Sequence, residues 1–544
     1  MIVGRRFVAI ATIAALAAVS GCASKAARLQ AATMPPLEQL RHDLVAIFSD
    51  PIIDHAHWSV AVDSIARGDS LFRQNAQRLQ VPASNQKLLT AAVAAERLGW
   101  EFRYTNRIYA AGPIADGVLD GDLVVVSDGD PTINPRHPER WGVLDEWAKQ
   151  LAARGLHLVG GQLVGDDNAF DEPGWGLGWS WDDIPFGYGA RVGALQYNES
   201  QAELMIGPGI EAGARAIISV SPLGSGLTID HGVTTAPAGS ETRVIVDRIP
   251  GSTVLHVRGQ IALDASPLTE SAAVANPTLQ YVNAFREALA RHGIFVGGSA
   301  IDIDDLRLAP PMANTTLLLE DHSPPLSDII DVTLKFSRNI YAETLLRSLA
   351  LQGLPPALTL RPFENLRVVP SSVEGRQAQG HPEASRGVSE SRDGGSRRIE
   401  GATAEAGLQV LRDTLLSWGV PNEGYLARDG SGLSRYDWIT ADTISALLVH
   451  LAKDARHADP FRRALAIPGD KGTLETRMVN TPLQTRVWAK TGSMSQVRAL
   501  SGYLTTVGGE PLVFAILVNG VRLPGREIDA VMDHALARLV EFRR

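Results

Sequence analysis

The sequence of 544 residues contains a single cysteine, Cys22, so no disulfide bond can form within the chain. It has no basic excess either: the net charge is -9, and no basic stripe is present that would attract a nucleic acid. The apolar run near the N-terminus, from Phe7 to Val19, is too short to span a bilayer. What remains is ordinary globular composition, 45% hydrophobic and 20% charged, in a chain long enough for about three or four domains.

The first residues predict export. Arg5 and Arg6 precede the short apolar run, which is the arrangement of a secretory signal. The run ends in Val19-Ser20-Gly21-Cys22, which resembles a bacterial lipobox, in which the signal is cleaved before the cysteine and the cysteine carries lipid. A plain secretory signal with an incidental cysteine is the alternative. Because the only cysteine occupies the one position that the motif requires, the lipobox is favoured.

This interpretation gives an expected location. Residues 1–21 are a lipoprotein signal peptide, Cys22 is the lipidated residue that attaches the protein to a membrane, and residues 22–36 are a tether. Ala23 lacks the aspartate that, by resemblance to Gram-negative sorting signals, retains a lipoprotein in the inner membrane. We therefore expect a lipoprotein on the periplasmic face of the outer membrane.

The stretch from Pro82 to Leu98, PASNQKLLTAAVAAERL, contains the first candidate catalytic pair. Ser84 and Lys87 are three residues apart in a run that is helical by composition, so their side chains share one face. A serine hydroxyl needs a base within hydrogen-bond reach, and a lysine kept neutral in a dry, cationic pocket can be that base. A helix-capping serine beside a solvated lysine gives the same tetrapeptide, so the pair needs support from other motifs.

Two further motifs follow in order. Ser337 and Asn339 flank one turn at the start of a second helical stretch, SRNIYAETLLRSLA. Lys490 to Gly492 follow the extended segment TRVWA and are predicted to end a strand. Together, S-x-x-K, S-x-N and K-T-G are the signature of penicillin-binding proteins and serine β-lactamases.

Other segments make the resemblance more specific: PASNQK at 82–87, DGSGLSR at 429–435, GTL at 472–474 and LSGY at 500–503. With them, the chain from about Trp58 onward resembles the class C, low-molecular-mass penicillin-binding proteins, which are D-alanyl-D-alanine carboxypeptidases and endopeptidases. The resemblance implies an α/β (α+β) penicillin-binding/β-lactamase-like transpeptidase domain, with β-rich inserted domains between the first and second catalytic motifs. It implies peptidoglycan stem peptides as substrates, covalent trapping by β-lactam antibiotics, and no metal or organic cofactor.

The resemblance also implies a role for each residue of the first two motifs. Ser84 attacks the carbonyl of the penultimate D-alanine after Lys87 takes its proton. Ser337 relays a proton to the leaving amine, and Asn339 holds the substrate amide. Water then hydrolyses the acyl-enzyme.

In the third motif, Lys490 and Thr491 face the terminal carboxylate of the substrate, the former as a charge and the latter as a hydroxyl donor. Gly492 leaves the strand edge open for the peptide. The backbone N–H groups of Ser84 and Ser493 stabilise the oxyanion.

Two charged residues are candidates for reading the stem peptide's diamino acid, whose free end carries an amine and a carboxylate. Arg435, at the end of DGSGLSR, is suited to bind the carboxylate through two parallel hydrogen bonds. Asp166, in GDDNAF, resembles the position from which family members reach toward the amine. A structural ion pair for Arg435 and a turn residue for Asp166 are the alternatives.

The predicted domain boundaries follow the motifs and changes in composition. From Tyr104 to about Leu308 the sequence has short alternating strands with frequent Gly, Pro and Asp, and one amphipathic helix is predicted at 277–292. The later insertion lacks any helical or strand period and is rich in Pro, Gly, Ser, Glu and Arg, so we expect most of it to be disordered. The catalytic domain is predicted to be built from three separate segments, at 37–103, 309–352 and 403–544. The inserted β-rich domains occupy 104–308, with a nested smaller domain at about 198–264, and the disordered insertion occupies 353–402.

The sequence leaves two other functions open. A β-lactamase needs a dedicated deacylating base, and no such glutamate stands out. A cell-wall-binding lipoprotein with a dead site would have no need to keep all three motifs intact. Carboxypeptidase and endopeptidase action both cut after D-alanine and differ only in what leaves, so both remain predicted.

Overall fold

The computed structural model describes residues 34–50, 53, 55–222, 224–249, 252–306, 315–351 and 403–544. The predicted signal peptide, Cys22, nearly all of the tether and the 353–402 insertion lie outside these residues. Among the helices that are described, none has the length and apolar character needed to cross a membrane.

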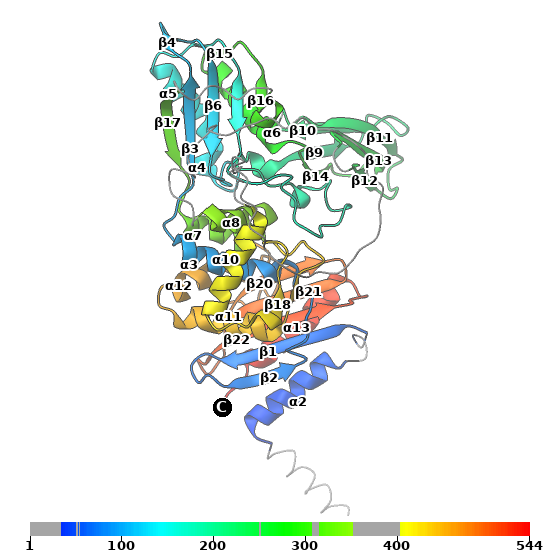
Figure 1. Cartoon of the computed structure of the whole chain (residues 1–544). Helices are drawn as coiled ribbons and strands as arrows, with labels where there is room; N and C mark the ends of the chain where they lie inside the picture. Colours follow the sequence, from blue (N-terminus) through cyan, green and yellow to red (C-terminus); the bar gives the residue numbers. More distant parts are fainter. Residues whose placement is uncertain are drawn as a thin grey trace, which may run out of the picture.

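A five-stranded antiparallel sheet organises the catalytic domain, in the order β2-β1-β22-β21-β20 (Figure 1). Its strands are β1 (His57–Ser64), β2 (Ser70–Gln74), β20 (Val487–Met494), β21 (Val497–Thr505) and β22 (Pro511–Asn519). The sheet joins the two ends of the chain, because β1 pairs along its whole length with β22. The predicted hairpin of β1 and β2 is confirmed, and β20 forms one edge of the sheet.

Helices cover both faces of this sheet. On one face, Leu40 and Leu44 of the first described helix meet Met532 and Leu536 of the last helix in one apolar cluster, as predicted for the two terminal helices. The other face carries the helices that hold the first two motifs. The helices are α2 (Pro36–Phe48) and α13 (Gly525–Val540) on the first face, and α3 (Gln86–Leu98), α7 (Leu326–Lys335), α8 (Asn339–Leu351), α10 (Ala404–Ser417), α11 (Ala441–Lys453) and α12 (Ala458–Arg463) on the other side.

The helix α3 is the buried centre of the second layer. It follows a short 3₁₀ turn, Ala83–Asn85, and all its residues from Gln86 to Ala95 are buried. Its alanines favour the helix and let neighbouring helices approach closely. Gly99 ends it with a φ of 85°, its N–H bonded to the carbonyl of Ala95, so the predicted helix end is confirmed.

The inserted region lies at the opposite end of the elongated molecule (Figure 1). Its main sheet has the order β16-β8-β6-β3-β17, a smaller sheet has the order β15-β7-β5-β4, and α6 packs on the main sheet. The elements are β3 (Thr105–Ala111), β4 (Ile114–Ala115), β5 (Val118–Leu119), β6 (Asp122–Ser127), α4 (Pro138–Trp141), α5 (Val143–Ala153), β7 (Leu158–Val159), β8 (Leu163–Asp166), α6 (Pro277–Arg291), β15 (Phe295–Val296), β16 (Ala300–Asp302) and β17 (Thr315–His322).

Two three-stranded sheets form the nested domain, in the orders β10-β9-β14 and β11-β13-β12. They enclose their own small apolar cluster. The strands are β9 (Gln201–Gly207), β10 (Ile217–Ser221), β11 (Thr228–Ala236), β12 (Arg243–Asp247), β13 (Val254–Ala262) and β14 (Leu268–Ala273). A last short pair, β18 (Tyr425–Leu426) and β19 (Trp438–Ile439), flanks the DGSGLSR loop.

Strand pairing moves two of the predicted boundaries. The strand β17 pairs antiparallel with β3, so the inserted region continues to His322 rather than ending at 308. The strand β14 pairs with β9, so the nested sheets extend past 264 to Ala273. Both strands join partners distant in sequence, and local composition does not reveal such pairing.

Candidate active site

Ser84 and Lys87 lie together at the start of α3, as their spacing predicts. Ser84 is partly exposed in the 3₁₀ turn, whereas Lys87 is 0% exposed. The Nζ atom of Lys87 lies 2.9 Å from Ser84 Oγ, 2.6 Å from Asn339 Oδ1 and 2.7 Å from the carbonyl oxygen of Ser431. The amide and carbonyl oxygens can only accept hydrogen bonds, so a neutral Lys87 gives its two N–H groups to them and its lone pair to the hydroxyl of Ser84.

The environment of Lys87 favours this neutral form near physiological pH. Burial lowers the pKa of Lys87 to about 7, and the nearby carboxylates of Asp429 and Glu343 partly oppose this shift. A base whose pKa lies near the working pH is present in the required form and is still strong enough to take a proton.

We expect the acylation rate to rise with pH through about 7. A lysine whose pKa is lowered is active when deprotonated, so activity is present above that pKa and is lost below it. Well below the pKa, the rate constant for labelling by a fluorescent penicillin should fall about tenfold per pH unit. Circular dichroism at each pH controls for unfolding. A rate that stays constant from about pH 5.5 to 8 contradicts this role of Lys87.

The second and third motifs meet through a second buried lysine. Lys490 is 0% exposed, and its Nζ donates to Ser337 Oγ at 2.7 Å and to the carbonyl of Thr491 at 2.8 Å. Burial, followed by the charge of Lys87, lowers the pKa of Lys490 well below its usual range. Ser337 has a φ of 59°, an unusual value for a serine that is often found at functional sites. Ser337 and Asn339 thus each bond one of the two lysines.

The third motif lies inside a strand rather than at its end, so that aspect of the prediction is wrong. Lys490, Thr491 and Gly492 occupy the middle of β20 and pair with β21. Pairing with a strand at 497–505 continues the extended conformation through the glycine. Thr491 is partly exposed and Ser493 is exposed.

Gly492 has a packing role that the sequence does not reveal. A Cβ atom at this position would lie 2.9 Å from the carbonyl oxygen of Pro82 and 2.9 Å from Cβ of Ala499. The glycine therefore lets β20 lie directly against the turn that carries the serine. Asn85 fastens the same contact, since its Nδ2 donates to the carbonyl of Lys490 at 3.1 Å.

A segment of the inserted region reaches this pocket. Trp179 Nε1 donates to Asp429 Oδ2 at 2.8 Å, and Ser434 Oγ donates to the carbonyl of Leu177 at 2.7 Å. Asn339 Nδ2 donates to the carbonyl of Tyr188 at 2.8 Å. The amide nitrogen expected to hold the substrate therefore holds the inserted region in this structure.

The structure does not support the predicted role of Asp166. This side chain is 3% exposed, and its carboxylate accepts a hydrogen bond from the backbone of Asn168. Burial raises the pKa of Asp166 to about 6, with smaller contributions from Asp304 and Asp302. The carboxylate is thus enclosed in the inserted region and is not positioned to meet a substrate amine.

Arg435 is partly exposed beside the third motif. Its Nη1 donates to the carbonyl of Ser495 at 3.2 Å, and its backbone N–H bonds the carbonyl of Gly178. The positive charge of Arg435 favours the ionised forms of Asp182 and Asp183 in the inserted region. Sequence reasoning missed this acidic pair; its signal was two adjacent aspartates in the glycine- and aromatic-rich segment WSWDDIPFGYG.

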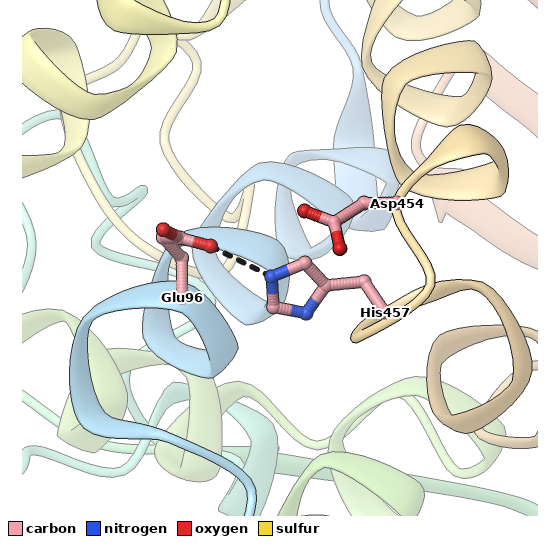
Figure 2. Close-up of side chains that lie close together, drawn as sticks. All are labelled: Glu96, Asp454 and His457. Atoms are coloured by element: carbon pink, nitrogen blue, oxygen red, sulfur yellow. Dashed lines mark hydrogen bonds and ion pairs between the residues drawn. The ribbon is translucent and has the colours of Figure 1, made fainter.

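A separate cluster of Glu96, Asp454 and His457 has side chains that metals often use (Figure 2). His457 Nε2 lies 2.7 Å from Glu96 Oε2, and Trp100 Nε1 lies 3.3 Å from His457 Nδ1. Arg456 Nη2 lies 3.0 Å from Glu96 Oε2 and 2.7 Å from Asp454 Oδ2. The arginine supplies the positive charge, so the cluster acts as an ion-pair clamp that joins the end of α3 to the segment after α11.

The pocket and the fold define a class of protein. A serine bonded to a buried lysine, a second serine–lysine pair and an edge strand beside them form the site of a serine acyl-transfer enzyme.

Comparison with known proteins identifies the family. Residues 40–360 and 392–539 match the D-Ala-D-Ala carboxypeptidase 3 (S13) family, and the chain belongs to it. A D-alanyl-D-alanine carboxypeptidase of Actinomadura sp. (strain R39) is 32% identical over 551 residues, which cover 99% of this chain and 91% of that protein. D-alanyl-D-alanine carboxypeptidase DacB of Haemophilus influenzae is 26% identical and covers 86% of each chain.

Solved structures support the fold. The crystal structure of penicillin binding protein 4 (DacB) from Haemophilus influenzae matches with a TM-score of 0.72 and 22% identity, over 92% of this chain and 100% of that one. The same protein complexed with a β-lactam matches with a TM-score of 0.67, 22% identity and the same coverage. The predicted fold class is confirmed, and the chain is a serine peptidase of the D-Ala-D-Ala carboxypeptidase class.

Proposed function

We propose that the protein hydrolyses the D-alanyl-D-alanine end of peptidoglycan stem peptides through an acyl-enzyme on Ser84. The observation that carries the proposal is the set of three contacts of Lys87, two of them to atoms that can only accept a hydrogen bond. These contacts direct the lone pair of a neutral lysine at the serine hydroxyl. Incubation with a defined muropeptide, followed by mass spectrometry of the products, tests the proposal.

Acylation begins with proton transfer. The proton of Ser84 passes to Lys87 Nζ as Oγ attacks the carbonyl carbon of the penultimate D-alanine. The backbone N–H groups of Ser84 and Ser493 stabilise the negative oxygen that forms. The substrate peptide lies along the edge of β20, whose other edge is paired with β21.

The intermediate then collapses. The bond to the leaving amine breaks, and that amine receives a proton from Ser337, which is reprotonated in turn by the proton that Lys87 took from Ser84, so that Lys87 is neutral again. Ser337 Oγ accepts a hydrogen bond from Lys490 at 2.7 Å. Lys490 and Thr491 bind the terminal carboxylate of the departing residue. Water then hydrolyses the Ser84 ester: its oxygen bonds to the acyl carbon, Lys87 takes one of its protons, and that proton passes to Ser84 Oγ as the ester bond breaks. A β-lactam follows the first step and remains on Ser84.

Arg435 and Asp183 together are suited to bind the free end of the diamino acid in the stem peptide. One offers a cation for the free carboxylate and the other an anion for the free amine. Asp183 accepts a hydrogen bond from Tyr188 Oη at 2.9 Å, and the backbone of Tyr188 contacts Asn339. This puts the acidic partner on the segment that reaches the active site and replaces the prediction for Asp166.

Arg435→Ala should therefore impair peptide turnover selectively. Loss of one charge-assisted hydrogen bond to the substrate costs about 1.5 to 3 kcal/mol, which corresponds to roughly one to two orders of magnitude in kcat/KM. Acylation by a penicillin that lacks the side arm should be almost unchanged. Arg258→Ala, an exposed arginine of the nested sheets, serves as the control. Equal losses with both substrates would show that Arg435 supports the fold or the serine.

Membrane attachment remains a proposal from the sequence. We infer that Cys22 is the lipidated first residue of the mature protein and that the enzyme works on the periplasmic face of the outer membrane. The VSGC motif supports lipidation of Cys22, and alanine instead of aspartate at position 23 supports the outer-membrane location. Cys22→Ala should release the enzyme into the soluble fraction, and an unmodified mature chain that begins at another residue contradicts the assignment.

The other two functions are less well supported. The relatives over most of the chain are D-alanyl-D-alanine carboxypeptidases, which favours a peptidase over a β-lactamase. A dead scaffold would have no need for the hydrogen bonds that connect Ser84 to Lys87 and Ser337 to Lys490. Stem-peptide trimming and cross-link cleavage use the same acylation step and remain joint candidates.

A further inference from the structure

Two fully buried carboxylates lie close enough to Lys87 to raise its pKa. Glu343 lies on α8 and Asp429 starts the DGSGLSR loop; both are 0% exposed. Glu343 Oε1 accepts hydrogen bonds from the backbone N–H of Gly430 at 3.0 Å and of Ser431 at 2.9 Å. Asp429 Oδ1 accepts one from the backbone N–H of Gly432 at 2.6 Å.

These contacts fix one peptide group against the lysine. The Ser431–Gly432 peptide gives its N–H to Asp429, and its carbonyl oxygen accepts the hydrogen bond from Lys87 Nζ at 2.7 Å. Glu343 holds the two preceding N–H groups. The position of one of the three partners of Lys87 therefore depends on both carboxylates.

Charges around this point come from several elements. The carboxylates of Asp429, Glu343 and Asp437 favour the charged form of Lys87, whereas Arg338 disfavours it. Lys490 lies in the same pocket, where burial and then the charge of Lys87 lower its pKa well below its usual range. When Lys87 takes the proton of Ser84, a positive charge forms in a fully buried site, and the negative charges stabilise it.

Neighbouring groups have opposite effects on the pKa of Glu343. Its Oε2 lies 3.5 Å from Arg347 Nη1. Neither of these two buried atoms has a hydrogen-bond partner among the described residues. Burial and the charge of Asp429 raise the pKa of Glu343 to about 7, and Arg347 opposes this. Its charge and that of Lys87 therefore change in the same pH range.

We propose that Glu343 is a positioning residue for acylation: it holds the Gly430–Ser431 backbone so that the Ser431 carbonyl meets Lys87, and its negative charge stabilises the lysine cation that forms when Ser84 loses its proton. No proton passes through Glu343. The inference rests on the proposed role of Lys87 as the base.

The variant Glu343→Gln separates charge from shape. Glutamine keeps an oxygen for the two N–H groups but removes the negative charge, so the Lys87 cation becomes less stable and its pKa falls. The acid limb of the pH–rate profile is the range in which the acylation rate falls as the pH decreases. This limb should therefore move to lower pH by about one unit or more. The limiting rate above the limb should fall about tenfold, because a weaker base remains. Rates are measured from about pH 5 to 9 with a fluorescent penicillin, which reports only on folded enzyme.

Two further variants complete the test. Glu343→Asp keeps the charge but shortens the side chain, so the limb should stay close to that of the wild type while the limiting rate falls. Asp171→Asn removes the other carboxylate partner of Arg347, 3.0 Å from its Nε, and should leave both quantities unchanged. If Glu343→Gln gives no folded chain, a displaced limb in Glu343→Asp overturns the proposal.

The outcomes distinguish this inference from the proposed function. A uniform loss of rate in Glu343→Gln with the limb unmoved shows that Glu343 only supports the fold, and no change at all shows that it does not act on Lys87; both overturn the inference. A wild-type enzyme that forms no penicillin adduct on Ser84, or that shows no limb, overturns the proposed function instead.

Discussion

Replacement of Ser84 by alanine is expected to abolish covalent labelling by penicillin and to remove D-alanine release entirely. Ser84 is the hydroxyl bonded to Lys87, at 2.9 Å, and it is partly exposed beside the edge strand. Without an oxygen at this position no ester can form, so the loss should be complete rather than partial. Gel fluorescence with a labelled penicillin and peptide mapping of the wild-type adduct measure the effect.

The controls are the other serines of the pocket. Ser431→Ala should keep labelling, because Lys87 contacts the backbone carbonyl of Ser431 and not its hydroxyl. Ser337→Ala should label more slowly but on the same residue. An adduct mapped to either of these serines contradicts the assignment of the nucleophile, as does labelling of Ser84→Ala at the wild-type rate.

Lys87→Met should lower the acylation rate by about two to four orders of magnitude, the usual contribution of a general base. Methionine has a similar length but no lone pair basic enough to take the proton, so Ser84 keeps its position while its proton has no acceptor. The variant also leaves Asn339 Oδ1 and the Ser431 carbonyl without the donors they have in the wild type. The rate should lose its dependence on pH near 7, since the titrating group is gone.

Lys149→Met is the matched control, because this lysine is 66% exposed on α5 of the inserted region. It should acylate at the wild-type rate with the wild-type pH profile. Melting temperatures of both variants show whether the fold is intact. A Lys87→Met enzyme that is folded and acylates within a few-fold of the wild type would show that another group takes the proton.

Much of the catalytic pocket could be predicted because its motifs are local. The distance between Ser84 and Lys87 follows from three residues of helix-like geometry, and the end of α3 follows from Gly99. The ordered set of motifs then led to the family, which the comparison confirms. The roles of the individual residues remain predictions that the variants above test.

The features that the sequence did not reveal depend on contacts between distant segments. The strand β17 belongs to the inserted region because it pairs with β3, about 200 residues earlier in the chain. Asp183 approaches Arg435 only through folding of the inserted region, whereas Asp166, in a similar local sequence, is enclosed elsewhere. Glu343 looks like an ordinary polar position of a helix until the DGSGLSR loop is placed against it.

The central claim is tested most directly by incubating the purified enzyme and Ser84→Ala with a stem peptide that ends in D-alanyl-D-alanine and identifying the products by mass spectrometry. We expect the wild type to release the terminal D-alanine, prior penicillin treatment to block this release, and Ser84→Ala to release none. An enzyme that leaves the peptide intact, or a Ser84→Ala variant that trims it as fast as the wild type, contradicts the proposed function.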